Sequence, residues 1–299
     1  SSFKTCLKPY MISSSIIPNK KVIRFSITYF CFISTFLLNA QNPIPPVGQW
    51  REHLNYQHAI QVVKGDLLYC ATTTNLFSVD GRNNIERYSK VTGLNDIGVQ
   101  CIGWDGTTQQ LVVVYTNSNM DILKNAIVKN IGDIKRSSIA GNKTIYNIYC
   151  KGGLAYLCSG LGVIVVNLSK YEIKDTWLIG NNGGQIKVNG FTSDGLQFYI
   201  ATEEGIKSIS VNSPGISNYA NWKNLSGSNG ISNGAVKNIV FTNNGIVAEK
   251  NDSLFILNGS NWSLLYTDAS WPIVNTSASE NKLLVCQRTA GGNARVIML

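Results

Sequence analysis

One pattern recurs six times along the sequence and limits the folds that the chain can adopt. Two short apolar strands joined by a polar turn can be aligned as "LLYCATTTNLFSVD", "LVVVYTNSNMDIL", "AYLCSGLGVIVVNL", "FYIATEEGIKSISV", "GIVAEKNDSLFILNG" and "LLVCQRTAGGNARVIM". The equivalent apolar positions are Tyr69, Val113, Tyr156, Tyr199, Val247 and Val285. They are separated by 44, 43, 43, 48 and 38 residues. The chain therefore repeats one structural unit.

Each unit holds further strands around this hairpin. The strands before it read "AIQVV", "VQCIGW", "IYNIYC", "VNGFT", "VKNIVF" and "VNTSA". More polar strands follow the first five hairpins, as "IERYSKV", "AIVKNI", "KDTWLI", "YANWKNL" and "WSLLYT". Turns rich in Gly, Asn, Asp and Ser separate the strands, and no helical period competes with them.

Four strands per unit at a period of 40 to 50 residues predict an all-β fold, a β-propeller with four-stranded blades. Such a blade is apolar on both faces, and stacking the blades around an axis buries those faces. We expect about six blades over residues 58–299, the last of them truncated because its outer strand is missing. This pattern predicts that the natural protein is longer than the chain.

The first 40 residues have a different composition. Starting from Met11, basic residues precede the apolar run "SITYFCFISTFLLNA". This order is typical of a secretory signal peptide at approximately 11–40, although an uncleaved anchor is the alternative. Residues 41–57 contain the Pro-rich "NPIPP" and "GQWREHL", a candidate closing strand, before the propeller at 58–299.

The net charge of +9 depends on this leader. Residues 1–40 contain five Lys or Arg residues and no acids, so their removal lowers the net charge to +4. A domain with that balance has no electrostatic reason to bind nucleic acid.

The reactive residues are scattered. Five cysteines remain beyond the leader, none in a CxxC pair, and each lies in or beside an apolar strand, which predicts small buried hydrophobes: Cys70, Cys101, Cys150, Cys158 and Cys286. The two histidines, His53 and His58, lie in no metal-binding pattern. The acidic pair Glu203–Glu204 occupies adjacent positions, whose side chains point to opposite faces of a strand.

No GxSxG, phosphate-loop or EF-hand motif occurs, and "GLGV" at 160–163 reads as a hairpin turn. We assign no catalytic, cofactor-binding or metal-binding residue and expect that the protein is not an enzyme. About two-thirds of the tryptophans should pack between blades, while one or two could line a glycan-binding surface: Trp50, Trp104, Trp177, Trp222, Trp262 and Trp271.

Four stretches carry a resemblance to a known family: "GQWREHLNYQHA", "YCATTTNLFSVD", "LNDIGVQCIGWD" and "LVVVYTNSNMDIL". They are similar to the amino-terminal β-propeller of the PorZ family, a surface component of the type IX secretion system. The likeness spans residues 41–299 and is most specific over 48–123. It implies seven blades in this propeller, a second propeller of the same kind and a carboxy-terminal sorting domain.

The resemblance also implies a function. Family members are exported to the outer-membrane surface and join an attachment complex that includes a sortase-like signal peptidase. That complex anchors secreted cargo to anionic lipopolysaccharide, which the PorZ component would bind and pass on without performing the covalent step. The resemblance brings no catalytic residue to this chain.

Two other functions remain open. "FYIATEEGI" is similar to the "LWIGT-x-x-GL" strand of two-component-regulator propellers, which fits a periplasmic sensor. A propeller lyase or glycosidase would need carboxylates that converge on one face, whereas the acids here lie mainly in turns.

Overall fold

The structure, a computed structural model, describes residues 55–279 and 281–299, which belong to one compact unit, Glu52–Leu299. The predicted signal peptide and the candidate closing strand lie outside the described residues. Among the residues described, no helix is long and apolar enough to span a membrane.

Antiparallel sheets follow one another along the chain, each built from consecutive strands. Blade 1 contains β1 (Ala59–Lys64), β2 (Leu68–Thr72), β3 (Leu76–Val79) and β4 (Ile85–Tyr88). Blade 2 contains β5 (Val99–Asp105), β6 (Gln110–Tyr115), β7 (Met120–Lys124) and β8 (Ile127–Ile131). Blade 3 contains β9 (Ile145–Lys151), β10 (Leu154–Ser159), β11 (Val163–Asn167) and β12 (Glu172–Trp177).

The later blades continue this order. Blade 4 contains β13 (Val188–Ser193), β14 (Gln197–Thr202), β15 (Ile206–Ser210) and β16 (Lys223–Asn224). Blade 5 contains β17 (Asn238–Thr242), β18 (Gly245–Lys250), β19 (Ser253–Asn258) and β20 (Asn261–Thr267). Blade 6 has three strands, β21 (Ile273–Ser279), β22 (Lys282–Arg288) and β23 (Ala294–Met298). Within the described residues the helices are single turns: η2 (Lys90–Thr92), α2 (Asp133–Arg136), η3 (Asn181–Gly183) and η4 (Tyr219–Asn221).

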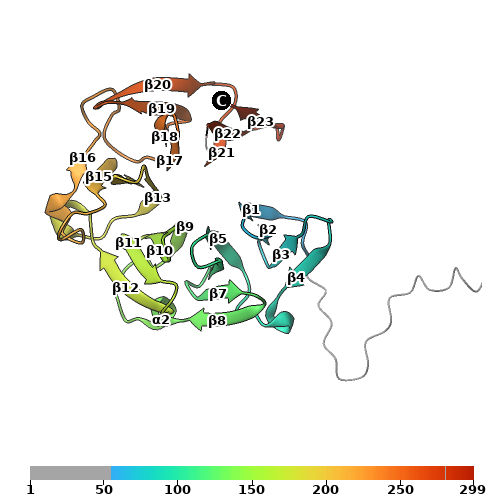
Figure 1. The fold of residues 1–299 in the computed structure, drawn as a ribbon. Helices are drawn as coiled ribbons and strands as arrows, with labels where there is room; N and C mark the ends of the chain where they lie inside the picture. The colour runs from blue at the N-terminus through green and yellow to red at the C-terminus, as the bar shows by residue number, and fades with distance from the viewer. Residues whose placement is uncertain (1–54, 280) are drawn as a thin grey trace, which may run out of the picture. The chain divides into compact units, whose positions relative to one another are not determined.

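The blades are arranged around a central axis, with the first strand of each blade innermost (Figure 1). Neighbouring inner strands contact one another in the order β1, β5, β9, β13, β17 and β21. The predicted β-propeller is therefore confirmed, including a sixth blade without its outer strand.

The hydrophobic core is divided among the spaces between successive blades. Met120 and Ile122 of blade 2, for example, pack with Leu157 and Ile164 of blade 3. The space between blades 3 and 4 is aromatic, with the rings of Tyr156 and Phe191 stacked at a centroid distance of 4.8 Å. Burying one large apolar side chain stabilises a fold by about 1.5–3 kcal/mol, so each blade depends on its neighbours for its stability.

Most of the tryptophans serve this packing, as the sequence predicted. Trp177, Trp222 and Trp262 are buried at or beside the outer strands of blades 3, 4 and 5. Trp104 stacks on Tyr69, with ring centroids 5.7 Å apart. Each buried indole N–H has a partner; that of Trp262, for instance, donates to the carbonyl oxygen of Leu225 at 2.9 Å. Apolar burial with a satisfied N–H is what makes Trp suitable for a blade interface.

The "GLGV" segment is a hairpin turn between β10 and β11, as predicted. The Ser159 backbone N–H donates to the carbonyl oxygen of Gly162 at 2.8 Å. Gly162 has a φ of 142°, and a Cβ there would lie 2.1 Å from the carbonyl oxygen of Trp177. Glycine is required at this position by both the backbone angle and the close approach of β12.

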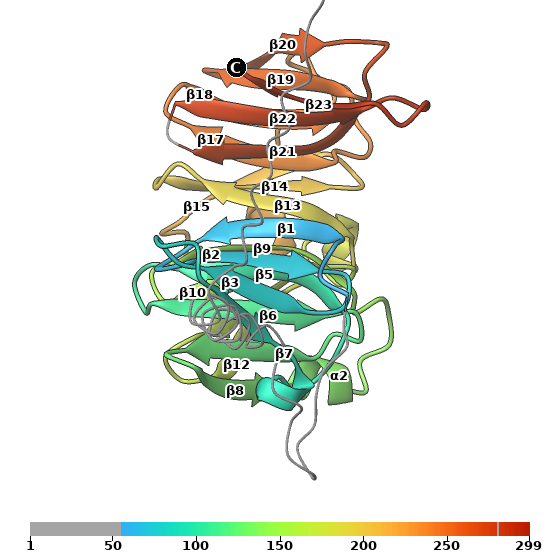
Figure 2. The same ribbon diagram turned by 90° about the vertical axis from the view of Figure 1, so that its right-hand side faces the viewer.

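The ring of blades is open between blade 6 and blade 1 (Figure 1). Figure 2 looks into this opening, with β21–β23 above β1–β4. Apolar side chains are exposed on the blades at both sides of it, namely Ile60, Val62, Leu68 and Ile85 in blade 1 and Leu284, Val296 and Met298 in blade 6. In blade 6, Leu284 lies directly opposite Met298 in the strand register, so these two residues share one face. Both faces thus lack the partner blade that buries the others.

We predict that residues 41–299 produced alone self-associate, because contiguous apolar patches of several hundred Å² drive association. Size-exclusion chromatography with light scattering should show oligomers that dissociate in the Leu284→Lys/Val296→Lys variant. Leu196→Lys is the matched control, since Leu196 is 77% exposed in blade 4, away from the opening. A protein extended by about 50–60 residues, one further blade, should be monomeric. A monodisperse short protein with a sharp thermal transition would instead favour a closed ring of six blades.

Candidate functional site

The inner strands present one unpaired edge to the centre of the ring. β1, β5, β9, β13, β17 and β21 each lie at the end of their sheet and pair with a single neighbour. Backbone N–H and C=O groups on such an edge need partners from side chains, water or a ligand. The centre of this propeller is therefore lined by polar backbone groups.

A cavity of about 830 Å³ occupies this centre and is lined by residues from all six inner strands. Each inner strand contributes one side-chain amide to the lining, and we call this set the amide ring: Gln61, Gln100, Asn147, Asn189, Asn238 and Asn275. By sequence these six strands are short and mostly apolar. An Asn or Gln in every one of them was the signal that could have revealed the ring.

β-bulges occur at the same level of most inner strands. The strand register skips one residue between Ala59 and Gln61, between Val99 and Cys101, and between Val188 and Gly190. Equivalent shifts occur in β9 and β21. The skipped residues all line the cavity: Ile60, Gln100, Tyr146, Asn189 and Val274. A bulge bends the strand and redirects side chains, so it helps to bring these residues to the channel wall.

Three members of the amide ring accept hydrogen bonds from inner-strand backbone N–H groups. Oε1 of Gln61 accepts from the Ile102 N–H at 2.9 Å. Oδ1 of Asn147 accepts from Ile148, and Oδ1 of Asn238 accepts from Ile239, at 2.8 and 2.9 Å. These donors occupy equivalent positions in blades 2, 3 and 5. The amide oxygens thus take the place of a missing neighbouring strand.

The amide NH₂ groups also link successive blades. Nδ2 of Asn189 donates to the carbonyl oxygen of Val236 at 2.9 Å. Nδ2 of Asn238 donates to the carbonyl oxygen of Thr276 at 3.0 Å, which joins blade 5 to blade 6. Gly190 faces Asn238, and a Cβ at Gly190 would lie 2.8 Å from the Asn238 Oδ1 atom. The small residue allows the amide to fit between the blades.

Lys237 and Glu249 are the charged residues among the described ones that line the cavity, and they pair with each other. The Lys237 Nζ atom lies 2.7 Å from Oε1 of Glu249, whose side chain is 1% exposed. Oγ1 of Thr276 donates to the other carboxylate oxygen at 3.1 Å. Burial raises the pKa of Glu249, and Lys237 opposes that rise. The channel therefore carries no net charge.

We predict that Lys237→Met lowers the free energy of unfolding by about 2 kcal/mol at pH 7.5, because a buried carboxylate loses its partner. Lys237 opposes the burial that raises the pKa of Glu249, so its removal raises that pKa further in the folded state. The deficit of the variant should therefore grow as the pH rises above about 4.5. Urea unfolding of both proteins at pH 4.5 and 7.5 measures this difference in the free energy of unfolding.

The control is the Lys237→Met/Glu249→Gln variant, which has no carboxyl group at this position. Its stability relative to the natural protein should not fall in the same pH window. An equal pH dependence in both variants would contradict the role given to the ion pair.

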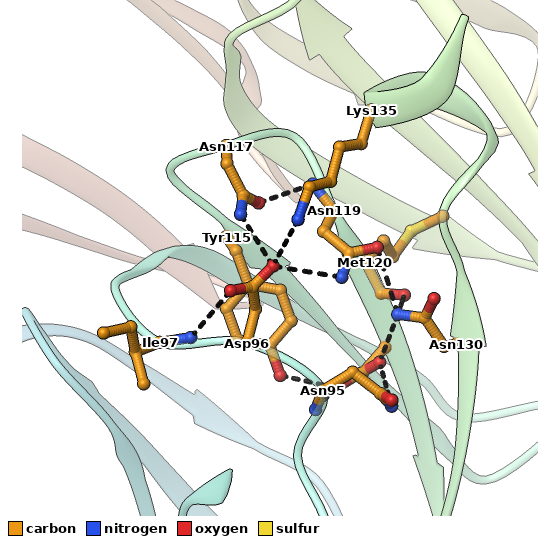
Figure 3. Close-up of polar contacts among 10 residues, drawn as sticks. Asn95, Asp96, Ile97, Tyr115, Asn117, Asn119, Met120, Asn130 and Lys135 are labelled. Carbon is orange, nitrogen blue, oxygen red and sulfur yellow. Dashed lines mark hydrogen bonds and ion pairs between the residues drawn. The ribbon is translucent and has the colours of Figure 1, made fainter.

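A second polar network includes Asn95 and Asp96 of the motif "LNDIG", which carried part of the family resemblance (Figure 3). Asp121 is fully buried and accepts hydrogen bonds from Nδ2 of Asn95 at 2.9 Å and Nδ2 of Asn130 at 2.8 Å. The Tyr115 hydroxyl donates to the same carboxylate at 2.5 Å. These bonds tie the loop before β5 to strands β6, β7 and β8.

Asp96 belongs to the same loop. It accepts hydrogen bonds from Nδ2 of Asn117 at 2.6 Å, from Nζ of Lys135 at 2.9 Å and from Nδ2 of Asn119 at 3.3 Å (Figure 3). Burial alone would raise the pKa of Asp96, but these hydrogen bonds outweigh it and lower the pKa to about 2. The carboxylates of this network are engaged within the fold, so its role is structural.

We predict that Asp96→Asn lowers stability at pH 7 by about 2 kcal/mol, because a pKa depressed by roughly two units stabilises the charged native form. That stabilisation is present above about pH 4 and is lost as the pH falls toward 2. Unfolding curves of the two proteins should therefore converge at about pH 2. Asp133→Asn is the control, since its ion pair with Arg136 is largely exposed and contributes little. A difference that persists at pH 2 would contradict this assignment.

In the part of the chain that the structure describes, the other reactive residues do not converge on a site. Glu203 pairs with Lys187 at 3.2 Å and Glu204 pairs with Lys207 at 2.8 Å, so the acidic pair is divided between two lysines. His58 is exposed, and His53 lies outside the described residues. Within residues 55–279 and 281–299, no group of three or more His, Cys, Asp or Glu residues could hold a metal ion.

The burial predicted for the cysteines holds for Cys70, Cys101 and Cys158, whereas Cys150 and Cys286 are half-buried. Cys101 and Cys158 are buried in the cluster between blades 2 and 3 and in the cluster between blades 3 and 4, respectively. Burial raises the pKa of both thiols and that of Cys150. A thiol with a raised pKa is a poor nucleophile, because the thiolate is the reactive form.

Comparison with known proteins decides the family. The family model described as "TSS9, PorZ, N-terminal beta-propeller domain" matches residues 68–223, more than half of the chain. The chain belongs to this PorZ family. The match includes the "LNDIG" network and the inner strands of blades 2, 3 and 4. A comparison with curated proteins gave no match.

Solved structures share the fold. PorZ of Porphyromonas gingivalis, described as an essential bacterial surface component of the type IX secretion system, superposes with a TM-score of 0.69 at 19% identity. The alignment covers 84% of this chain and 34% of that one, so the chain spans about a third of the length of that PorZ. The extracellular domain assigned to a one-component system of B. thetaiotaomicron has a TM-score of 0.59 at 16% identity, covering 82% and 34%. The AfRom2 CNH domain has a TM-score of 0.57 at 15% identity, covering 86% and 85%. At these identities the likeness shows the fold alone.

Proposed function

We propose that this protein is a non-enzymatic surface component of the type IX secretion system, which helps an attachment complex to anchor secreted cargo to anionic lipopolysaccharide. The observation that carries the proposal is the match of residues 68–223 to the PorZ family. The protein of P. gingivalis with the same fold is described as a surface component of that system. Its partners would be the sortase-like signal peptidase, other proteins of the complex and the lipopolysaccharide.

The chemistry of the described residues supports a binding role over a catalytic one. The carboxylates with lowered pKa values, among them Asp96, Asp194 and Glu203, accept hydrogen bonds within the fold. A glycosidase or lyase needs an acid and a base that face the same substrate. The central channel offers amides and a charge-neutral ion pair instead.

We predict that deletion of the gene leaves secreted cargo uncleaved in the periplasm or released without its lipid anchor. Immunoblots of periplasmic, membrane and medium fractions measure this outcome, and cargo that has lost its sorting domain but carries lipopolysaccharide migrates as a diffuse, slower band. The complemented strain is the control. Normal surface attachment of cargo in the deletion strain would overturn the proposal.

The alternative function, a periplasmic sensor propeller, is motivated by "FYIATEEGI" and by the apolar leader. The natural sequence that follows Leu299 distinguishes the two proposals. A second propeller and a terminal β-sandwich sorting domain would support the secretion component. A membrane-spanning helix and a kinase domain would support the sensor.

A further inference from the structure

We propose that the central channel is a binding site for neutral carbohydrate, and that the amide ring provides its hydrogen-bonding groups. This inference rests on the proposed function in one respect, because the ligand proposed there is a lipopolysaccharide and so carries a chain of sugars. Nothing in the family match assigns a ligand to this channel.

Part of the amide ring has unused hydrogen-bonding capacity. Gln100 and Asn275 make no side-chain hydrogen bond to any described residue, although both line the cavity. Gln61 and Asn147 use only their oxygens, so their NH₂ groups have no partner in the described part of the chain. An amide group without a protein partner at the wall of a cavity can bind a ligand at no cost to the fold.

The charge of the channel selects the class of ligand. An anionic group such as phosphate is bound in proteins by Arg or Lys, or by a cluster of donors. Lys237 is the cation among the described lining residues, and Glu249 already neutralises it at 2.7 Å. An amide both donates and accepts, as does a sugar hydroxyl. The amide ring therefore matches a neutral polyhydroxylated ligand better than an anion, and would recognise sugar units rather than the charged groups of a lipopolysaccharide.

The size and the remaining lining agree with this class. A volume of about 830 Å³ lies within the range of roughly 300–1,000 Å³ that is typical of small-molecule sites. Aromatic residues also line the cavity, and among them Phe241 is 37% exposed. The C–H faces of sugars pack on aromatic rings, while their hydroxyls need the polar groups between those rings. The channel could thus hold a short oligosaccharide.

The test is direct binding to the protein in its natural length. The probes are the neutral trisaccharides maltotriose, cellotriose and mannotriose, with inorganic phosphate as the anionic probe, measured by saturation-transfer NMR and calorimetry. We expect saturable binding of at least one trisaccharide and no displacement by phosphate. The variant Gln100→Ala/Asn275→Ala should weaken that binding about tenfold or more, because it removes two hydrogen-bonding groups.

The control variant is Asn212→Ala, which removes an amide from the loop after β15, outside the lining of the channel. Both variants should keep the melting temperature of the natural protein, because none of the three removed side chains bonds to a described residue. Absence of saturable trisaccharide binding, an unchanged affinity in the channel variant, or displacement of the sugar by phosphate would each overturn the inference.

The deletion strain and the Gln100→Ala/Asn275→Ala variant together separate this inference from the proposed function. If the deletion strain anchors cargo normally, the proposed function fails, whatever the channel binds. If the deletion strain loses anchoring and the channel variant retains the full affinity for the sugar, the channel inference fails and the proposed function stands.

Discussion

The face-to-face burial of neighbouring sheets is the constraint on which the rest of this structure depends. Every cluster of buried apolar residues combines side chains from two successive blades. A four-stranded sheet of this size with two apolar faces cannot bury both of them alone. The requirement is satisfied at each interface from blade 1 to blade 6, and it is unsatisfied at the two faces that border the opening (Figure 1). The burial of apolar sheet faces therefore accounts both for the stacking of successive blades and for the exposed apolar residues of the first and the last blade.

Stacking sheets around an axis has a second consequence at the centre. The inner strands cannot pair with one another across the channel, so each leaves a row of backbone groups without a strand partner. Side-chain amides bind some of these groups, because their oxygens accept hydrogen bonds from the backbone N–H groups of Ile102, Ile148 and Ile239. The same amides can also bind a ligand, because a side-chain amide has further hydrogen-bonding groups besides the oxygen that accepts from a backbone N–H.

The chemistry of the acidic residues differs between two places in the fold. Asp96 and Asp121 are held by amide, ammonium and hydroxyl donors in the loops and strands of blade 2, where they fix the conformation of the family motif (Figure 3). Glu249 lies at the wall of the channel and is neutralised by Lys237. In both cases the carboxylate is engaged within the fold.

The sequence alone determined the fold class, the number of blades and the missing outer strand of the sixth, because strand period and turn residues are local signals that repeat. It also predicted that about two-thirds of the tryptophans pack between blades and that the cysteines are buried, which holds for Trp177, Trp222, Trp262, Cys70, Cys101 and Cys158. It did not reveal the amide ring, although one Asn or Gln stands in each inner strand. Only the tertiary structure decided that those residues meet. Residues about 40 positions apart come together because the blades close around an axis, and neither strand period nor turn chemistry encodes what lies at that axis.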